Sequence, residues 1–145
     1  MKLKTLMAIS GLSATVAAAS PLDVAGLWLT EAGTGHIEIK DCGDGTPCGT
    51  LVWVDPMAAN THLDAKNRTA TLRNRPLIGV PIVWGFKRAT DAWRGGKIYN
   101  PEDGKTFRAS LSVTQDADLE VKGCLGPLCR TNIWTRLDAS RSLDR

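Results

Sequence analysis

The sequence predicts an all-β protein, an eight-stranded antiparallel up-and-down barrel with a long connection between its third and fourth strands. Two observations predict this fold. Apolar and polar residues alternate along most of the chain after residue 22, and turn-forming residues separate the alternating segments. A period of two is typical of strands with one buried and one exposed face. Eight short strands can close into a barrel and leave no exposed edge. A two-sheet sandwich is the alternative that periodicity leaves open.

Each strand follows from the same alternation between turn signals. The clearest is residues 105–113, where Phe107, Ala109, Leu111 and Val113 share one face and polar residues occupy the other. Glycine, aspartate and proline clusters mark the turns between strands. The strands are expected at residues 25–30, 36–42, 48–54, 80–88, 92–99, 105–113, 118–123 and 129–137.

The connection from Asp55 to Gly79 is unusually long and polar. A loop of this length in a compact domain is generally functional or contains its own helix. Residues 64–72 could form about two helical turns, with Pro76 ending them. Since turns alternate between the two ends of a meander, the connection should share its end with the turns near Gly33, Asp103 and Gly126, and an opening is expected there.

The N-terminal residues predict export. Lys2 and Lys4 precede an apolar run that ends in small residues, which is the plan of a cleaved signal peptide. We expect cleavage after Ala19, so that residues 1–19 are the signal peptide and residues 20–145 a single domain. The alternative, a membrane anchor, needs about 20 apolar residues, and this run is shorter. The expected location is therefore periplasmic or secreted, with no membrane span after cleavage.

The charge balance argues against a nucleic-acid partner. The chain has 18 Lys plus Arg and 15 Asp plus Glu, and cleavage would remove Lys2 and Lys4. The remaining net charge is 16 − 15 = +1. A nucleic-acid-binding domain of this size ordinarily has a marked basic excess.

The four cysteines form two close pairs in the sequence. Four cysteines could hold one zinc ion, but these spacings differ from the C-x-x-C pairs of structural zinc sites. An exported chain meets an oxidising compartment, which favours disulfides. In an up-and-down barrel the two pairs lie at opposite ends, too far apart to cross-link. The predicted disulfides are Cys42 with Cys48 and Cys124 with Cys129.

The first and last strands carry residues that suit barrel closure. Gly26 and Trp28 lie on the first strand, and Trp134 and Arg136 on the last. These strands are neighbours in a closed barrel, so the Arg136 guanidinium can stack on the Trp28 ring. A G-x-W motif on the first strand with an arginine on the last resembles the lipocalin and wider calycin pattern.

A second resemblance covers nearly all of the chain after the signal peptide. The ordered motifs are GLW at 26–28, NRPLIG at 74–79, WRGGKIYNPEDGKTF at 93–107 and RTNIWTR at 130–136. In this order they resemble the bacterial domain-of-unknown-function 2147 family. The resemblance implies a small exported protein with a lipocalin-like barrel, and it implies no catalytic residue. Cys124 and Cys129 depart from many members, so that disulfide would belong to a subset.

The expected function is binding of a small apolar or amphipathic molecule. Trp53, Trp84 and Phe86 fall on expected strands, and several of these bulky rings should point into the barrel. Arg73 and Arg75 could hold a carboxylate or phosphate group at its mouth. The alternative is a non-catalytic envelope structural or interaction module whose barrel is filled by side chains.

Catalysis is the less favoured expectation. His36 and His62 are the two histidines, and His62 lies in the same connection as Asp55 and Asp64. A hydrolase would need these groups to converge on one pocket. No metal-ligand spacing is recognisable among them. We therefore expect no enzyme activity, no cofactor and no metal.

Overall fold

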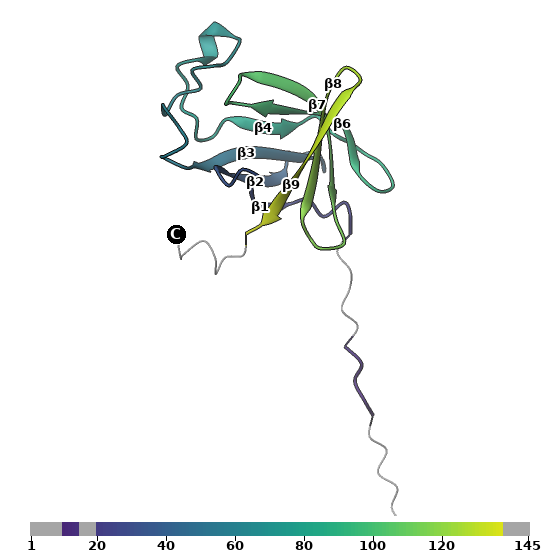
Figure 1. Ribbon diagram of the computed structural model, residues 1–145. Helices are drawn as coiled ribbons and strands as arrows, with labels where there is room; N and C mark the ends of the chain where they lie inside the picture. Colours follow the sequence, from purple (N-terminus) through teal and green to yellow (C-terminus); the bar gives the residue numbers. More distant parts are fainter. Residues whose placement is uncertain (1–9, 15–19, 138–145) are drawn as a thin grey trace, which may run out of the picture.

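The structure is a computed structural model that describes residues 10–14 and 20–137. These residues form nine strands and one short 3-10 helix (Figure 1). The predicted signal peptide, residues 1–19, lies largely outside the described residues, and so does its cleavage site after Ala19. In chain order the elements are β1 (Gly26–Leu29), β2 (Gly35–Asp41), β3 (Pro47–Val54), η1 (Ala70–Leu72), β4 (Pro81–Trp84), β5 (Lys87–Arg88), β6 (Trp93–Asn100), β7 (Lys105–Val113), β8 (Leu119–Leu125) and β9 (Leu128–Arg136).

The strands close into the eight-stranded antiparallel barrel that the sequence predicts. Sequential strands pair from β1 to β4 and from β6 to β9, and β5 adds a two-residue pairing beside β6. Two further pairings close the barrel, β1 with β9 and β4 with β6. Every pairing is antiparallel, and the closed order excludes the sandwich alternative.

The segment expected to be one strand over residues 80–88 is divided into β4 and β5. Gly85 separates them with a φ of 77°, a conformation that glycine adopts without strain. Phe86 turns inward and is 3% exposed. It fits there because Gly96 has no side chain, and a Cβ on Gly96 would overlap the Phe86 ring. The alternation gave no sign of this break because residues 80–86 are all apolar or glycine.

Large apolar side chains fill much of the barrel interior. Trp28 and Leu111 are fully buried, and Trp134 and Trp93 are 5% and 6% exposed. At Gly49 the side chains of Val83, Ile37 and Ile39 leave no room for a Cβ. Burial on this scale supplies most of the folding free energy of a small barrel. The side chains of this core therefore leave no wide lumen within the described part of the barrel.

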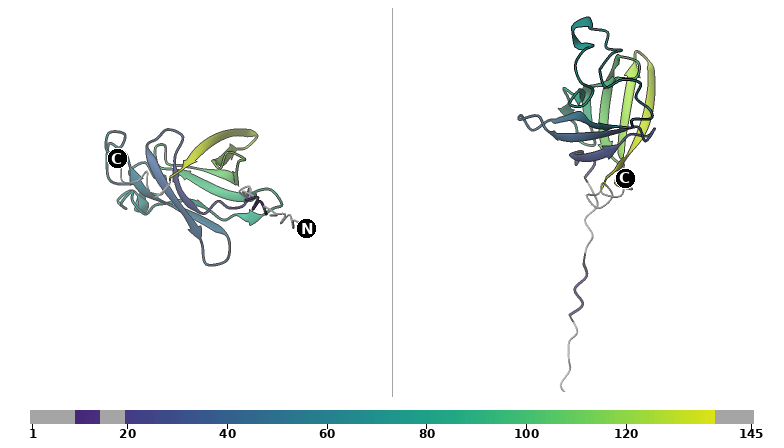
Figure 2. Two further views of the ribbon diagram at one scale, coloured as in Figure 1. Left: turned by 90° about the horizontal axis from the view of Figure 1, so that it is seen from below. Right: turned by 90° about the vertical axis from the view of Figure 1, so that its left-hand side faces the viewer.

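The connection from residue 55 to residue 80 contains less helix than expected. Instead of two helical turns over residues 64–72, it has the three-residue helix η1 and an isolated bridge between Leu63 and Pro76. Asn67 explains the difference, because its side-chain oxygen accepts a hydrogen bond from the Thr69 amide at 2.9 Å. Such local bonds compete with helical ones. Figures 1 and 2 show the connection projecting beyond the strands at one end of the barrel.

The two predicted disulfides, Cys42 with Cys48 and Cys124 with Cys129, are confirmed. Each closes the turn of a hairpin, β2–β3 and β8–β9 respectively. Disulfides of this kind are typical of proteins in oxidising compartments. Among residues 10–14 and 20–137, no helix is both long and apolar enough to cross a membrane.

Candidate functional site

A partly open hollow of about 860 Å³ lies between the connection and the neighbouring strands. Its volume falls within the range of roughly 300–1,000 Å³ that is usual for small-molecule sites. Residues from β3, β4, β6, β7, β8 and the connection line it: Cys48, Asn67, Arg68, Thr69, Leu72, Arg75, Pro81, Trp84, Tyr99, Gly104, Lys105, Thr106 and Leu125.

Part of the hollow is on the outer face of the barrel. Val83 of β4 pairs with Ile98 of β6, and Val83 is fully buried in the core. Successive side chains on a strand point to opposite faces, so Trp84 and Tyr99 point outward. Tyr99 is nevertheless only 4% exposed, because it is hydrogen-bonded to side chains of the connection. The connection therefore forms one wall of the hollow and the outer face of the strands another.

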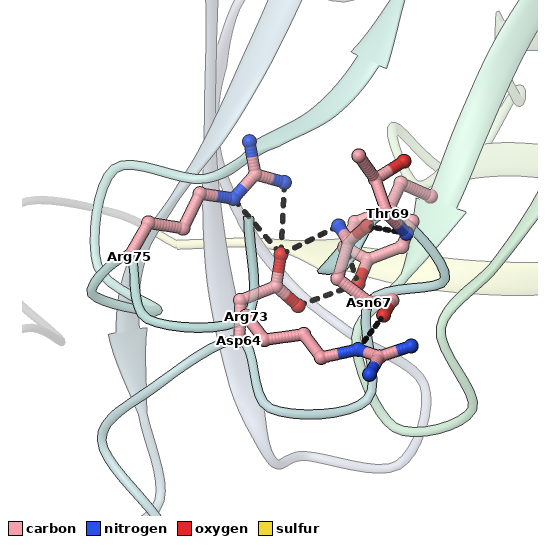
Figure 3. Close-up of polar contacts among 6 residues, drawn as sticks. Asp64, Asn67, Thr69, Arg73 and Arg75 are labelled. Carbon is pink, nitrogen blue, oxygen red and sulfur yellow. Dashed lines mark hydrogen bonds and ion pairs between the residues drawn. The ribbon is translucent and has the colours of Figure 1, made fainter. Parts of the chain in front are cut away.

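A buried carboxylate organises this wall. Asp64 is 0% exposed, and its Oδ2 atom accepts hydrogen bonds from Arg75 Nε at 2.9 Å and Asn67 Nδ2 at 2.8 Å. The Arg75 Nη2 atom is also 2.9 Å from Oδ2. The other oxygen, Oδ1, accepts the hydroxyl of Tyr99 at 2.5 Å. Figure 3 shows Arg75 and Asn67 converging on the carboxylate. These bonds tie the connection to β6.

The same cluster changes the ionisation of Tyr99. Burial is the main cause, and the hydrogen bond to Asp64 and the negative charge of that group act in the same direction; together they raise the pKa of Tyr99 to about 12. Tyr99 therefore remains a neutral donor to Asp64 at physiological pH. The Arg75 guanidinium also lies over the Tyr99 ring, 5.9 Å from its centroid.

Backbone contacts hold the rest of the wall. Arg73 donates from Nε to the Asn67 carbonyl at 2.7 Å, which ties the two sides of the segment together (Figure 3). The turn between β6 and β7 packs on the same segment. A Cβ on Gly104 would overlap the Lys66 carbonyl, so this close approach requires glycine. The wall is thus supported from both β6 and the β6–β7 turn.

The lining combines apolar surface with positive charge. Leu72, Pro81, Trp84 and Leu125 provide the apolar part. Arg68, Arg75 and Lys105 provide the cationic part, and no aspartate or glutamate lines the hollow. Since Asp64 is fully buried behind Arg75, its charge is not presented to the hollow. The arrangement suits a molecule with an apolar body and an anionic group.

The residues expected to bind a ligand are placed differently from one another. Trp84 and Arg75 line the hollow. Trp53 stacks on His36 with ring centroids 4.3 Å apart, away from the hollow. Phe86 is part of the core, and Arg73 is engaged within the connection. Arg68, which the sequence also offered as a cation for an anionic group, lines the hollow as well, whereas Asn67, Tyr99 and Lys105 were not anticipated. Tyr99 was the one with a signal, as the single tyrosine of the chain in a strand.

The groups considered for a hydrolase do not meet. His62 is exposed, and neither it nor Asp55 lines the hollow. Asp55 accepts a hydrogen bond from the Met57 amide at 2.9 Å, and Asp64 is committed to its buried partners. None of these three residues lines the hollow.

The residues expected to close the barrel lie at its other end. The Arg136 guanidinium lies over the Trp28 ring, 4.1 Å from its centroid. It donates to the carbonyls of Ala25 at 3.0 Å and Asp23 at 3.1 Å. Gly26 has a φ of 143°, and a Cβ there would come within 2.5 Å of Arg136 Nη1. Trp134 is buried in the core nearby on β9.

Comparison with known proteins identifies the family. The model of the family described as an uncharacterized protein conserved in bacteria, DUF2147, matches residues 26–136. The chain belongs to this family. The match includes both walls of the hollow and the Arg136–Trp28 contact, so these are features of the DUF2147 part of the chain.

A solved structure supports the fold of this DUF2147 chain. Protein HP1028 from the human pathogen Helicobacter pylori, described as belonging to the lipocalin family, is similar with a TM-score of 0.72 and 24% identity. The alignment covers 85% of this chain and 88% of that protein. At this identity the likeness establishes a lipocalin-like barrel and nothing about a ligand. No curated protein matches the chain.

Proposed function

We propose that this chain is an exported, non-catalytic binding protein that holds a small amphipathic molecule with an anionic group in the hollow beside the connection. The single observation that carries the proposal is the composition of the lining, in which three cations and no carboxylate accompany apolar side chains. The apolar body would lie against Trp84 and Leu125, and the anionic group near Arg68 and Lys105.

The packed barrel interior moves the expected site outward. Lipocalin-like barrels offer their lumen when it is wide enough, but an eight-stranded barrel can equally be filled by side chains. Here Trp28, Trp93, Trp134 and Phe86 occupy the interior. Filling the barrel and binding a ligand are therefore compatible, because the hollow lies between the connection and the barrel.

Binding without catalysis is supported by the character of the lining. Neither of the two histidines lines the hollow, and the tyrosine in it is held neutral by its raised pKa. No general base is thus poised near neutral pH. An exported location, periplasmic or secreted, is supported by the two disulfides and by the N-terminal sequence.

Two fluorescent probes test the anionic part of the proposal. Anilinonaphthalene sulfonate and N-phenylnaphthylamine share an aromatic body, but only the first carries a negative charge. The wild-type protein should bind the sulfonate more tightly. Lys105→Gln should lower the affinity for the sulfonate about tenfold, because roughly one charged contact is lost. The affinity for the neutral probe should be nearly unchanged.

Lys40→Gln is the matched control, since Lys40 is exposed on β2 and pairs with Glu38 outside the hollow. It should change neither affinity. Equal effects of the two lysine variants, or no saturable binding of either probe, would refute the proposal. Native mass spectrometry of protein purified from its own host should in addition show a bound species of a few hundred daltons.

A further inference from the structure

A second, shallower depression of about 220 Å³ lies on the outer face of β6, β7 and β8. Its lining is again free of acidic side chains. Three cations from three strands, Arg94, Arg108 and Lys122, line it together with Ser110. The two hollows share no lining residue.

A β-bulge opens this depression. The pairing of β6 with β7 runs from Trp93 opposite Leu111 to Gly96 opposite Ala109, so β6 contains one extra residue here. Bulges redirect side chains and recur next to binding sites. Gly95 lies in the bulge with a φ of 67°, and no atom lies within 4 Å of where its Cβ would be. The bulge thus leaves open space beside Gly95.

Two like-charged pairs lie across the strands around the depression. Lys97 is directly opposite Arg108 in the β6–β7 ladder, and Lys87 is directly opposite Arg94 in the β5–β6 ladder. Like charges at directly opposed positions repel and destabilise a sheet. Within the described residues, Arg108 and Lys122 form no ion pair, and Arg94 pairs only with the exposed Asp91 at 3.1 Å.

We propose that this depression binds a phosphate-class anion, held by Arg94, Arg108 and Lys122 with the Ser110 hydroxyl as a further donor. An anion between these strands would relieve the repulsion between these cations. A tetrahedral oxyanion can accept from all four side chains at once, and arginine offers it a paired set of donors. The anion can come from two sources, a free small phosphate or the head group of an anionic lipid.

Amide chemical shifts of the wild-type protein provide the primary test. Titration with inorganic phosphate should give saturable shifts at Gly95, Ser110 and Lys122, and potassium chloride at equal ionic strength should not. In a parallel arm, vesicles of phosphatidylglycerol are compared with vesicles of phosphatidylcholine in a flotation assay. Saturable binding of phosphate identifies a free anion, and flotation with phosphatidylglycerol alone identifies a lipid head group. Failure of both, or equal shifts with chloride, overturns the proposal.

A matched pair of double variants locates the site. The double variant Arg108→Gln with Lys122→Gln should lower the affinity for the anion by about tenfold or more. Arg130→Gln with Lys40→Gln removes the same two residue types outside the depression and should change it less than twofold. Equal losses in both would show general screening and refute the site. Because the first pair removes repulsion, its thermal unfolding temperature should be unchanged or higher, and its sulfonate probe affinity should equal that of the wild type.

Discussion

The two ends of the barrel each place an arginine over an aromatic ring, with different partners. At the closed end, Arg136 lies over Trp28 and donates to two backbone carbonyls. At the end with the hollow, Arg75 lies over Tyr99 and pairs with the fully buried Asp64. The first arginine ties together strands that are already paired. The second neutralises a charge that has no access to water.

This difference indicates which of the two contacts can be removed at the smaller cost in stability. Carbonyls near the surface can accept a hydrogen bond from water when an arginine is removed, so the loss of folding stability is moderate. A buried carboxylate without its cation must keep an unpaired charge or bind a proton, and both are unfavourable. The wall of the hollow therefore depends on one ion pair more strongly than the barrel closure depends on Arg136.

The largest expected effect is that of Arg75→Gln. Removing one partner of a buried ion pair ordinarily costs about 3–5 kcal/mol in the free energy of unfolding. Urea unfolding followed by tryptophan fluorescence measures the global loss, and amide hydrogen exchange of residues 62–77 detects the case in which the connection opens alone. Arg94→Gln is the control, because its partner Asp91 is exposed, and it should change stability by about 0.5 kcal/mol or less. A loss below about 1 kcal/mol in both measurements for Arg75→Gln would contradict the comparison.

Tyr99→Phe should have an intermediate effect. It removes the hydroxyl that donates to Asp64 Oδ1 and leaves that buried oxygen without a donor. The expected loss is about 1–3 kcal/mol in the free energy of unfolding, with the ring packing retained. Chemical denaturation of the variant beside the wild type provides the measurement. A stability equal to that of the wild type would mean that Arg75 alone satisfies the carboxylate.

The same residue predicts a pH dependence. The pKa of Tyr99 is about 12 in the folded protein and about 10 in the unfolded chain. Between these pH values the folded protein keeps the Tyr99 proton and the unfolded chain releases it. The contribution of this proton to stability is therefore complete below about pH 10 and is lost as the pH rises to about 12. Tyr99 is the single tyrosine, so the ultraviolet absorbance of tyrosinate reports it alone. Ionisation of the folded protein at the ordinary value would show that the cluster is open in solution.

Much of the barrel could be predicted from sequence because its signals are local. Alternation over residues 105–113 follows directly from the pleat of one strand, and the cysteine pairing follows from the alternation of turns. The break at Gly85 could not be predicted in this way, since it depends on Phe86 meeting the space over Gly96, a contact between two strands.

The candidate site was less predictable because it depends on distant contacts. Asp64 and Tyr99 are 35 positions apart, and nothing near either residue indicates the other. The arginines of the connection also look equivalent in the sequence. Only the fold directs Arg75 toward Asp64 and Arg68 toward the hollow, while Arg73 binds a backbone carbonyl. Composition could suggest cations near an opening but not which of them remain available to a ligand.

The smallest expected effect is that of Arg136→Gln. Stacking on Trp28 contributes about 0.5–2 kcal/mol, and the carbonyls of Ala25 and Asp23 can be hydrated when the guanidinium is gone. We therefore expect a loss of about 1–2 kcal/mol in the free energy of unfolding, smaller than that for Arg75→Gln. Urea unfolding under identical conditions compares the two. Because Arg136 lies outside the hollow, the variant should bind the sulfonate probe as the wild type does. If it loses more stability than Arg75→Gln, then closure at β1 and β9, rather than the buried ion pair, is the contact on which the fold most depends.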